Sequence, residues 1–175
     1  GQIIFSNAGD KTGPLHTNFN ITYTNWQPKW VRSKRFKEVY PIDNIADAQE
    51  GPGGMRANNS VKGFTATCGQ SVFRGDRLPK DMLGHLFFSE PVGHLIRRAE
   101  FKVDAMGRRV MHNVYQEQEK EFITTTDANS RIVNSATGPD GTLYLVDMYR
   151  GIIQQGGWVN ECSYLRKAVQ YYGLD

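Results

Sequence analysis

Charged and polar side chains lie within or next to predicted strands across residues 74–150, and side chains of these types could bind a ligand or move a proton. A guanidinium can hold carboxylate and sugar hydroxyl oxygens, and a carboxylate can bind Ca²⁺ or accept a substrate proton. His94 follows Gly93 where a turn leads into a strand, and it is the candidate catalytic base. The candidate binding residues are Arg74, Glu90, Arg97, Asp127, Arg131, Asn134, Asp147, Tyr149 and Arg150. The alternative is that the arginine and aspartate side chains pair with one another between neighbouring sheets and have only a structural role.

The spacing of cysteine and histidine gives little support for a metal or haem site. The two cysteines, Cys68 and Cys162, can form at most one disulfide, and the sequence leaves open whether they meet. No Cys-x-x-Cys motif occurs, which excludes covalent haem c attachment and a zinc knuckle within this chain. The four histidines show no i, i+3 or i+4 spacing, so the sequence assigns no metal ligand and the metal content stays unknown.

The composition is that of an ordinary folded domain, with 39% hydrophobic residues, 22% charged residues and a net charge of +3. These values exclude a chain that is disordered throughout. No run of about 18 apolar residues occurs, so no membrane-spanning helix is predicted. A basic stretch from Lys29 to Lys37 is interleaved with aromatic residues, but it has too few charges for the roughly 6–10 phosphate contacts of a typical nucleic-acid footprint. We therefore expect no nucleic-acid partner.

Short strands separated by Gly, Pro, Asn and Asp predict an all-β fold. The predicted strands are Gln2–Ser6, Phe64–Thr67, Ser71–Arg74, Leu86–Ser89, His94–Val103, Glu121–Thr125, Ile132–Ser135, Leu143–Asp147 and Gly151–Gln154. The sharpest turn is Gly138–Gly141, because Pro139 fixes φ at the second position and Gly141 supplies a permissive backbone before an alternating strand. A strand, a turn and a second strand ending in Asp is typical of a propeller blade, although the pattern also fits a sandwich.

Two segments interrupt the strand pattern. Residues 9–60 are rich in Asn, Pro and Gly, and we interpret them as a long irregular insertion within a partial propeller over residues 1–160. Residues 161–175 are predicted to form a C-terminal helix, because their apolar residues share one helical face and Gly173 stands at a capping position. The sequence begins at Gly1 with neither an initiator Met nor a signal pattern, which leads us to expect a processed or partial chain.

Four motifs, in order along the chain, resemble one propeller family. They are Phe64–Asp76 (FTATCGQSVFRGD), Gly84–Arg98 (GHLFFSEPVGHLIRR), Thr126-Asp127 with Arg131 and Asn134, and Gly138–Gln154 (GPDGTLYLVDMYRGIIQ). The sequence closely resembles the β-propeller of the membrane-bound dehydrogenase-like proteins of planctomycetes and Bacteroidetes, which are relatives of the glucose/sorbosone dehydrogenases. The resemblance extends from about Tyr40 to Asp175 and implies the C-terminal portion of a propeller, with about three four-stranded antiparallel blades and the terminal helix leading toward a closing strand.

The resemblance also implies a function. Family members are exported bacterial proteins of the periplasm or cell surface, and the implied reaction is oxidation of a sugar, alcohol or aldehyde with electrons passed to quinone or haem. Related quinoproteins hold pyrroloquinoline quinone over the central channel with Ca²⁺ nearby, and haem c is expected only in a domain outside this chain. The expected partners are the remaining blades or a larger assembly, a cytochrome domain and a small-molecule substrate. The alternative is a non-catalytic propeller that acts as a binding or structural subunit.

One departure from the family pattern concerns a cysteine. The family often has Cys at the position of Ser89, apparently as the partner of the residue that matches Cys68. The resemblance therefore implies that this disulfide is absent here and that Cys68 is free or paired elsewhere.

Overall fold

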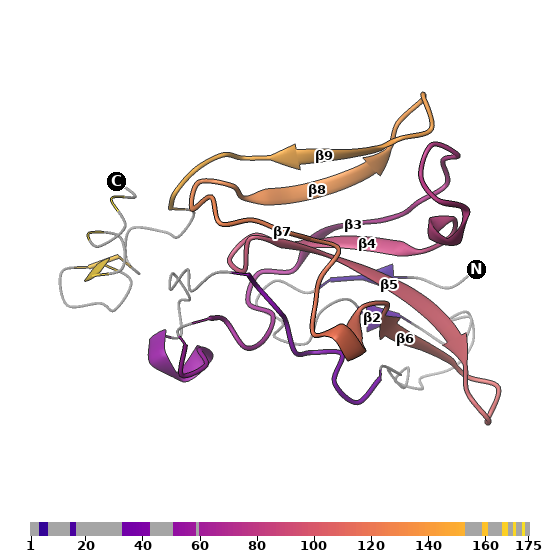
Figure 1. Cartoon of the computed structure of the whole chain (residues 1–175), viewed down its shortest axis with the longest axis horizontal. Coiled ribbons are helices and arrows are strands. Elements are labelled where there is room, and N and C mark those ends of the chain that lie inside the picture. Colours follow the sequence, from indigo (N-terminus) through magenta and orange to yellow (C-terminus); the bar gives the residue numbers. More distant parts are fainter. Residues whose placement is uncertain are drawn as a thin grey trace, which may run out of the picture.

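The computed structural model describes residues 4–6, 15–16, 33–42, 51–58, 60–152, 159–160, 166–167, 170 and 173. Apart from single helical positions at residues 166, 167 and 170, the regular structure consists of antiparallel strands and short 3₁₀ turns, which confirms the all-β prediction (Figure 1). The strands are β1 (Ile4–Phe5), β2 (Leu15–His16), β3 (Cys68–Val72), β4 (Leu86–Glu90), β5 (Leu95–Val103), β6 (Arg109–Asn113), β7 (Ile123–Thr124), β8 (Ile132–Thr137) and β9 (Leu143–Asp147). The 3₁₀ turns are η1 (Gly51–Gly54), η2 (Lys80–Met82) and η3 (Gln116–Gln118).

The largest sheet contains five strands in the order β3-β4-β5-β6, with β7 paired to one end of β5. Every residue of β4 is buried, because its side chains alternate between two hydrophobic clusters on opposite faces of the sheet. Leu86 and Phe88 pack with Phe36 and Phe64 in the first cluster, whereas Phe87 packs in the second. The apolar run Leu86–Phe88 does not alternate with polar residues because β4 is covered on both faces.

The β8–β9 hairpin forms a separate two-stranded sheet that covers one face of the larger sheet beside β3 and β4 (Figure 1). Ile132 at the start of β8 joins Phe73, Phe87 and Ile96 in the second cluster, and the hydroxyl oxygens of Ser71 and Ser135 lie 2.8 Å apart between the sheets. The predicted turn at residues 138–141 is confirmed, since the Gly141 amide donates to the Gly138 carbonyl at 3.1 Å.

The segment 33–42 comes from the region interpreted as an insertion, yet it supplies part of the first cluster. Phe36 and Val39 are at most 1% exposed, and Glu38 forms an isolated bridge with Gly63. These residues therefore cover one face of the larger sheet. The remaining residues of 9–60 lie largely outside the described part of the chain, as does the predicted helix 161–175 apart from single positions.

The strand predictions differ from the structure at several places. Strand β3 occupies Cys68–Val72 and not the predicted Ser71–Arg74, and β2 (Leu15–His16) was not predicted. Residues 64–67 are irregular, because the amides of Thr65 and Ala66 donate to the buried Glu90 carboxylate and not to a neighbouring strand. Strand β6 was not predicted; it follows a turn in which Asp104 accepts the Arg108 amide at 2.9 Å. Gly151 and Ile152 are not in a strand, and the rest of Gly151–Gln154 lies outside the described residues.

The sheets of the described residues do not close into a ring, so the propeller itself stays a proposal. Within the described residues, no helix is long and apolar enough to cross a bilayer.

Candidate functional site

Several sequence-predicted site residues meet beside the turn between β4 and β5, and we call this group the His94 cluster. Its members are His94, Asp127, Ser130, Arg131, Asp147, Tyr149 and Arg150. They come from three short segments: the turn at residues 91–94, the loop before β8, and the residues at and after the end of β9. Because β8 and β9 are antiparallel, the start of one lies beside the end of the other, which brings Arg131 next to Asp147.

Asp147 holds the loop before β8 in place. Its Oδ2 accepts the Ser130 hydroxyl at 2.7 Å, and its Oδ1 accepts the Arg131 amide at 2.6 Å and the Tyr149 amide at 2.8 Å. Partial burial would raise the pKa of this carboxyl, but the hydrogen bonds from Ser130, Tyr149 and Arg131 outweigh it and lower the pKa. Asp147 is therefore an ionised anchor whose oxygens are occupied by its own chain.

The Arg131 side chain is completely buried and, like Asp147, holds segments of the backbone together. Its guanidinium donates to the carbonyl oxygens of Pro91 at 2.9 Å, Arg150 at 3.2 Å and Gly151. These contacts tie the β4–β5 turn to the segment that follows β9. A buried guanidinium surrounded by carbonyl oxygens satisfies the backbone and offers no exposed clamp for a ligand.

His94 has an unusual backbone conformation and a buried ring nitrogen without a hydrogen-bond partner among the described residues. Its φ of +52° is in the left-handed region, and so is that of Tyr149 at +47°. Its Nδ1 lies 2.7 Å from the Ser130 carbonyl oxygen, so Nδ1 carries the proton and donates it. Nε2 is left with a lone pair, is buried, and has no hydrogen-bond partner among the described residues.

The environment of His94 keeps its imidazole neutral. Burial, reinforced by the nearby Arg131 guanidinium, lowers the pKa of His94 from 6.5 to about 4. A neutral imidazole with a free Nε2 lone pair can accept a hydrogen bond, but a pKa this low makes it a weak proton acceptor at neutral pH.

Tyr149, Arg150 and Asp127 form the outer part of the cluster. The side chains of Tyr149 and Arg150 are exposed, and a hydrogen bond from the phenol to the Asp127 carboxylate raises the pKa of Tyr149. Asp127 also accepts the Asn129 amide at 2.9 Å. These residues give the cluster a polar surface.

The remaining four predicted binding residues lie elsewhere. Arg97 and Glu90 are buried in the larger sheet, on β5 and β4. Arg74 lines an open hollow between residues 74–77 and the turn at 137–141, and its amide donates to the Thr137 hydroxyl. Asn134 is exposed on β8, where its side-chain oxygen accepts the Ser135 amide.

Arg97 forms the main buried ion pair of the described residues with Glu121, a residue that the sequence did not single out. Both side chains have 0% exposure, and Arg97 Nε donates to Glu121 Oε2 at 2.8 Å. Burial raises the pKa of Glu121, against the attraction of the Arg97 guanidinium. Arg97 also donates to the carbonyl oxygens of Phe36 and Glu38, so it links the segment 33–40 to β5.

Glu90 organises the loop before β3. Its side chain is fully buried and accepts the amides of Thr65 and Ala66 and the hydroxyl of Thr65 at 2.9–3.1 Å. Burial raises the pKa of Glu90, and the hydrogen bonds from Ala66 and Thr65 oppose the shift. A carboxylate has about four acceptor sites, and those of Glu90 are filled by backbone and hydroxyl donors. Glu90 therefore stabilises this loop.

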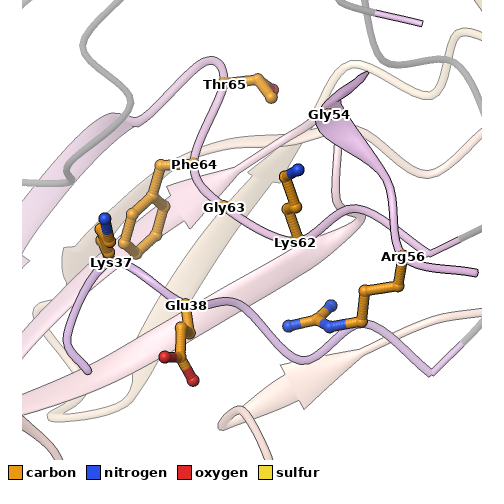
Figure 2. A pocket seen from close by; sticks show the side chains of 8 residues that line it. All are labelled: Lys37, Glu38, Gly54, Arg56, Lys62, Gly63, Phe64 and Thr65. Atoms are coloured by element: carbon orange, nitrogen blue, oxygen red, sulfur yellow. The ribbon is translucent and has the colours of Figure 1, made fainter. Parts of the chain in front are cut away.

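A pocket of about 460 Å³ lies between the segment 33–40 and residues 54–65 (Figure 2). It is lined by Lys37, Glu38, Gly54, Arg56, Lys62, Gly63, Phe64 and Thr65. The sequence predicted no binding residue here, although Lys37 belongs to the basic stretch. Lys37 is distant in the chain from Arg56 and Lys62, and the bridges Glu38–Gly63 and Met55–Val61 help to bring the three residues to one pocket.

The described residues do not fit a quinone and Ca²⁺ site of the kind that the resemblance implies. No group of three or more His, Cys, Asp or Glu side chains among them could hold a metal ion. The two fully buried arginines donate to carbonyl oxygens of the chain itself. Any such cofactor would need residues outside the described part of the chain.

The family comparison bears on the whole chain. The model of a family described as a domain of unknown function, DUF7133, matches residues 1–173. The chain belongs to the DUF7133 family. Neither the search of curated proteins nor the search of solved structures found a match. The family description names no activity.

The structure places Cys68 of the DUF7133 chain directly opposite Ser89 in the β3–β4 pair. Cys68 is a free thiol, and burial, together with the nearby Glu90 carboxylate, raises its pKa to about 11, so it is unreactive at neutral pH. Directly opposed residues of antiparallel strands have Cα atoms about 4.5–5.5 Å apart, which lies within the range that a disulfide spans.

We therefore expect the Ser89→Cys variant to form a disulfide with Cys68 under oxidising conditions. The bond should raise the free energy of unfolding by about 2–4 kcal/mol, because it closes a loop of about 20 residues in the unfolded chain. Mass spectrometry of non-reduced peptides should find positions 68 and 89 linked. The matched control is Ser71→Cys, because Ser71 lies opposite Phe87 and not opposite a cysteine. The new cysteine should stay reduced. A disulfide between positions 68 and 71 at the same yield as that between 68 and 89 would contradict the register.

Proposed function

We propose that this chain is the scaffold section of an exported β-propeller dehydrogenase, which oxidises a sugar, alcohol or aldehyde and passes the electrons to quinone or haem. In this proposal the described residues hold neighbouring blades together, and the redox chemistry takes place outside them. The location is the periplasm or the cell surface. The proposal starts from the resemblance of four motifs to dehydrogenase-type propellers.

The observation that carries the scaffold role is the saturation of the predicted binding residues. Arg97, Arg131, Glu90 and Asp147 would have to present free donors or acceptors to act on a substrate, yet each is engaged by amides, hydroxyls, carbonyls or a buried partner. The antiparallel meander β3-β4-β5-β6 also has the strand order of one blade, and the β8–β9 hairpin packed against it could begin the next.

A catalytic role for His94 is the second candidate, favoured by one observation. The Nε2 lone pair is buried without a partner among the described residues, and two residues of the cluster have a left-handed backbone. Backbone strain and unsatisfied polar atoms are concentrated at functional sites more than elsewhere. In that role His94 would accept a hydrogen bond from a substrate hydroxyl at Nε2.

An assay of the full-length protein separates these alternatives. The protein is loaded with pyrroloquinoline quinone and Ca²⁺, and reduction of an artificial electron acceptor is measured with a panel of aldoses, alcohols and aldehydes. The scaffold proposal expects activity in the wild type and a kcat/KM within about twofold in His94→Asn, measured well below the melting temperature. A loss of about 100-fold or more in kcat would support the catalytic role of His94.

A third outcome would overturn the dehydrogenase proposal itself. If the full-length protein is folded, contains no redox cofactor after purification and reduces no acceptor with any substrate of the panel, the propeller is a binding or structural subunit. Asn is chosen at position 94 because it tolerates a left-handed backbone better than other residues except Gly. His112→Asn, at a half-buried histidine on β6, is the matched control and should leave the activity unchanged.

A further inference from the structure

The pocket beside the segment 33–40 has an excess of positive charge. Lys37, Lys62 and Arg56 contribute three cations, and Glu38 contributes one carboxylate. The Glu38 carboxylate is already held by Arg35 at 2.9 Å and by the Tyr40 hydroxyl at 3.0 Å. Figure 2 shows Lys37 on one side of Gly63 and Lys62 and Arg56 on the other. The site is therefore electropositive, and its one acidic residue is engaged outside it.

The donors of the pocket are only partly used. Among the described residues, the ammonium groups of Lys37 and Lys62 have no ion-pair partner. Arg56 donates from Nη1 to the Val61 carbonyl and from Nη2 to the Val39 carbonyl, both at 2.6 Å, which fixes its orientation. Nη1 also donates to the Ser60 hydroxyl at 3.4 Å. A guanidinium has five N–H donors, so Nε and one hydrogen of Nη2 remain. A fixed guanidinium and two lysines that line one pocket are a suitable set of donors for an oxyanion.

The size of the pocket indicates an organic ligand. A volume of about 460 Å³ is within the range of about 300–1,000 Å³ that is usual for small-molecule sites and is far larger than an inorganic ion needs. Gly63 leaves its part of the wall open, since a Cβ there would meet only the Lys37 carbonyl oxygen, at 3.5 Å. The Thr65 hydroxyl donates to Glu90, so its lone pairs can accept a hydrogen bond from a ligand hydroxyl.

We propose that this pocket binds a small hydroxylated ligand through a tetrahedral oxyanion, a phosphate or sulfate ester. Lys37, Lys62 and Arg56 hold the oxyanion, and Thr65 faces the rest of the ligand. The proposal rests on the geometry of the described residues and does not depend on the dehydrogenase function.

Isothermal titration calorimetry of the full-length protein with three probes tests the proposal. The probes are glucose 6-phosphate, glucose 6-sulfate and glucose. We expect saturable binding of at least one ester, with an affinity that falls as NaCl is raised from low to high concentration, and no detectable binding of glucose. Whichever ester binds more tightly identifies the source of the oxyanion. Equal binding of glucose, or no saturable binding of either ester, would overturn the proposal.

Variants locate the binding to this pocket. Lys37→Gln combined with Lys62→Gln should weaken the binding of the preferred ester about tenfold, because each exposed charge contact is worth roughly a factor of three. Lys80→Gln, an exposed lysine on η2 outside the pocket, is the matched control and should leave the affinity unchanged.

A second pair of variants at Gly63 tests the pocket without removing a lysine. Gly63→Asp should abolish binding by adding a negative charge to the wall, whereas Gly63→Ala should fold and bind the ester. Melting curves of all variants confirm that the loss of binding is not a loss of folding. An effect of Lys80→Gln equal to that of the double lysine variant, or unchanged binding by Gly63→Asp, would contradict the assignment.

Discussion

The Arg97→Met variant is expected to lose about 3–5 kcal/mol of the free energy of unfolding, the largest single-residue effect that we predict. The side chains of Arg97 and Glu121 are both completely buried, and methionine removes the positive charge while it leaves the carboxylate in the interior. The variant also leaves the carbonyl oxygens of Phe36 and Glu38 without their donor. An unpaired buried charge costs much more than the pair itself contributes, because the carboxylate has lost its water and gained nothing in return.

The Arg97 guanidinium also lies over two aromatic rings of the first cluster. Its central carbon is 4.7 Å from the centre of the Phe64 ring and 5.4 Å from that of Phe36. The substitution should therefore loosen the packing of the segment 33–40 on β5. Urea denaturation measures the global effect, and hydrogen exchange of the β5 amides measures the local one.

Two further variants make the Arg97 result interpretable. Arg108→Met removes an exposed arginine whose partner is Asp104, and it should have little effect because exposed pairs contribute little. Arg97→Met combined with Glu121→Leu removes the unpaired charge and should recover part of the loss. It should not recover all of it, since the Tyr40 amide would still lack its acceptor on Glu121. An Arg97→Met variant no less stable than Arg108→Met would contradict the buried ion pair.

Local sequence signals were sufficient to predict much of the fold. Strands β4, β5, β8 and β9 follow from apolar or alternating runs, and the turn at residues 138–141 follows from Pro139 and Gly141. The meeting of His94, Arg131 and Asp147 could also be anticipated in part, because all three stand at strand ends. Polar residues at the ends of neighbouring antiparallel strands come together wherever the strands pair.

Long-range partners could not be predicted from the sequence. Nothing in the local sequence indicates that Glu121 pairs with Arg97, or that Glu90 takes the amides of Thr65 and Ala66 out of a predicted strand. Strand β6 was missed because the turn that precedes it depends on Asp104 rather than on Pro or Asn-Gly. The basic pocket was missed because tertiary bridges assemble it.

The second large effect concerns the dependence of stability on pH. The pKa of His94 falls from 6.5 in the unfolded chain to about 4 in the folded protein, so between these values the unfolded state binds the proton and the folded state does not. Stability contributed by the neutral imidazole is therefore present above pH 6.5 and is lost as the pH falls toward 4. The difference in pKa corresponds to about 3 kcal/mol.

We expect His94→Asn to remove this part of the pH dependence. The free energy of unfolding of the wild type should fall between pH 6.5 and pH 4 by about 3 kcal/mol more than that of the variant. The carboxylates of Asp127 and Asp147 and the guanidinium of Arg131 also face His94, but they are present in both proteins and largely cancel in the difference. His112→Asn should change the pH profile less, because His112 is only half-buried and has no hydrogen bond to a buried carbonyl among the described contacts.

The direction of the pH effect distinguishes two roles of the imidazole. If His94 were protonated and paired with Asp147 in the folded protein, its pKa would be raised, and the wild type would gain stability relative to the variant as the pH falls. The free Nε2 and the Nδ1 contact with the Ser130 carbonyl require the opposite. A wild type that becomes relatively more stable below pH 6 would therefore overturn the neutral tautomer on which the geometry of the cluster depends.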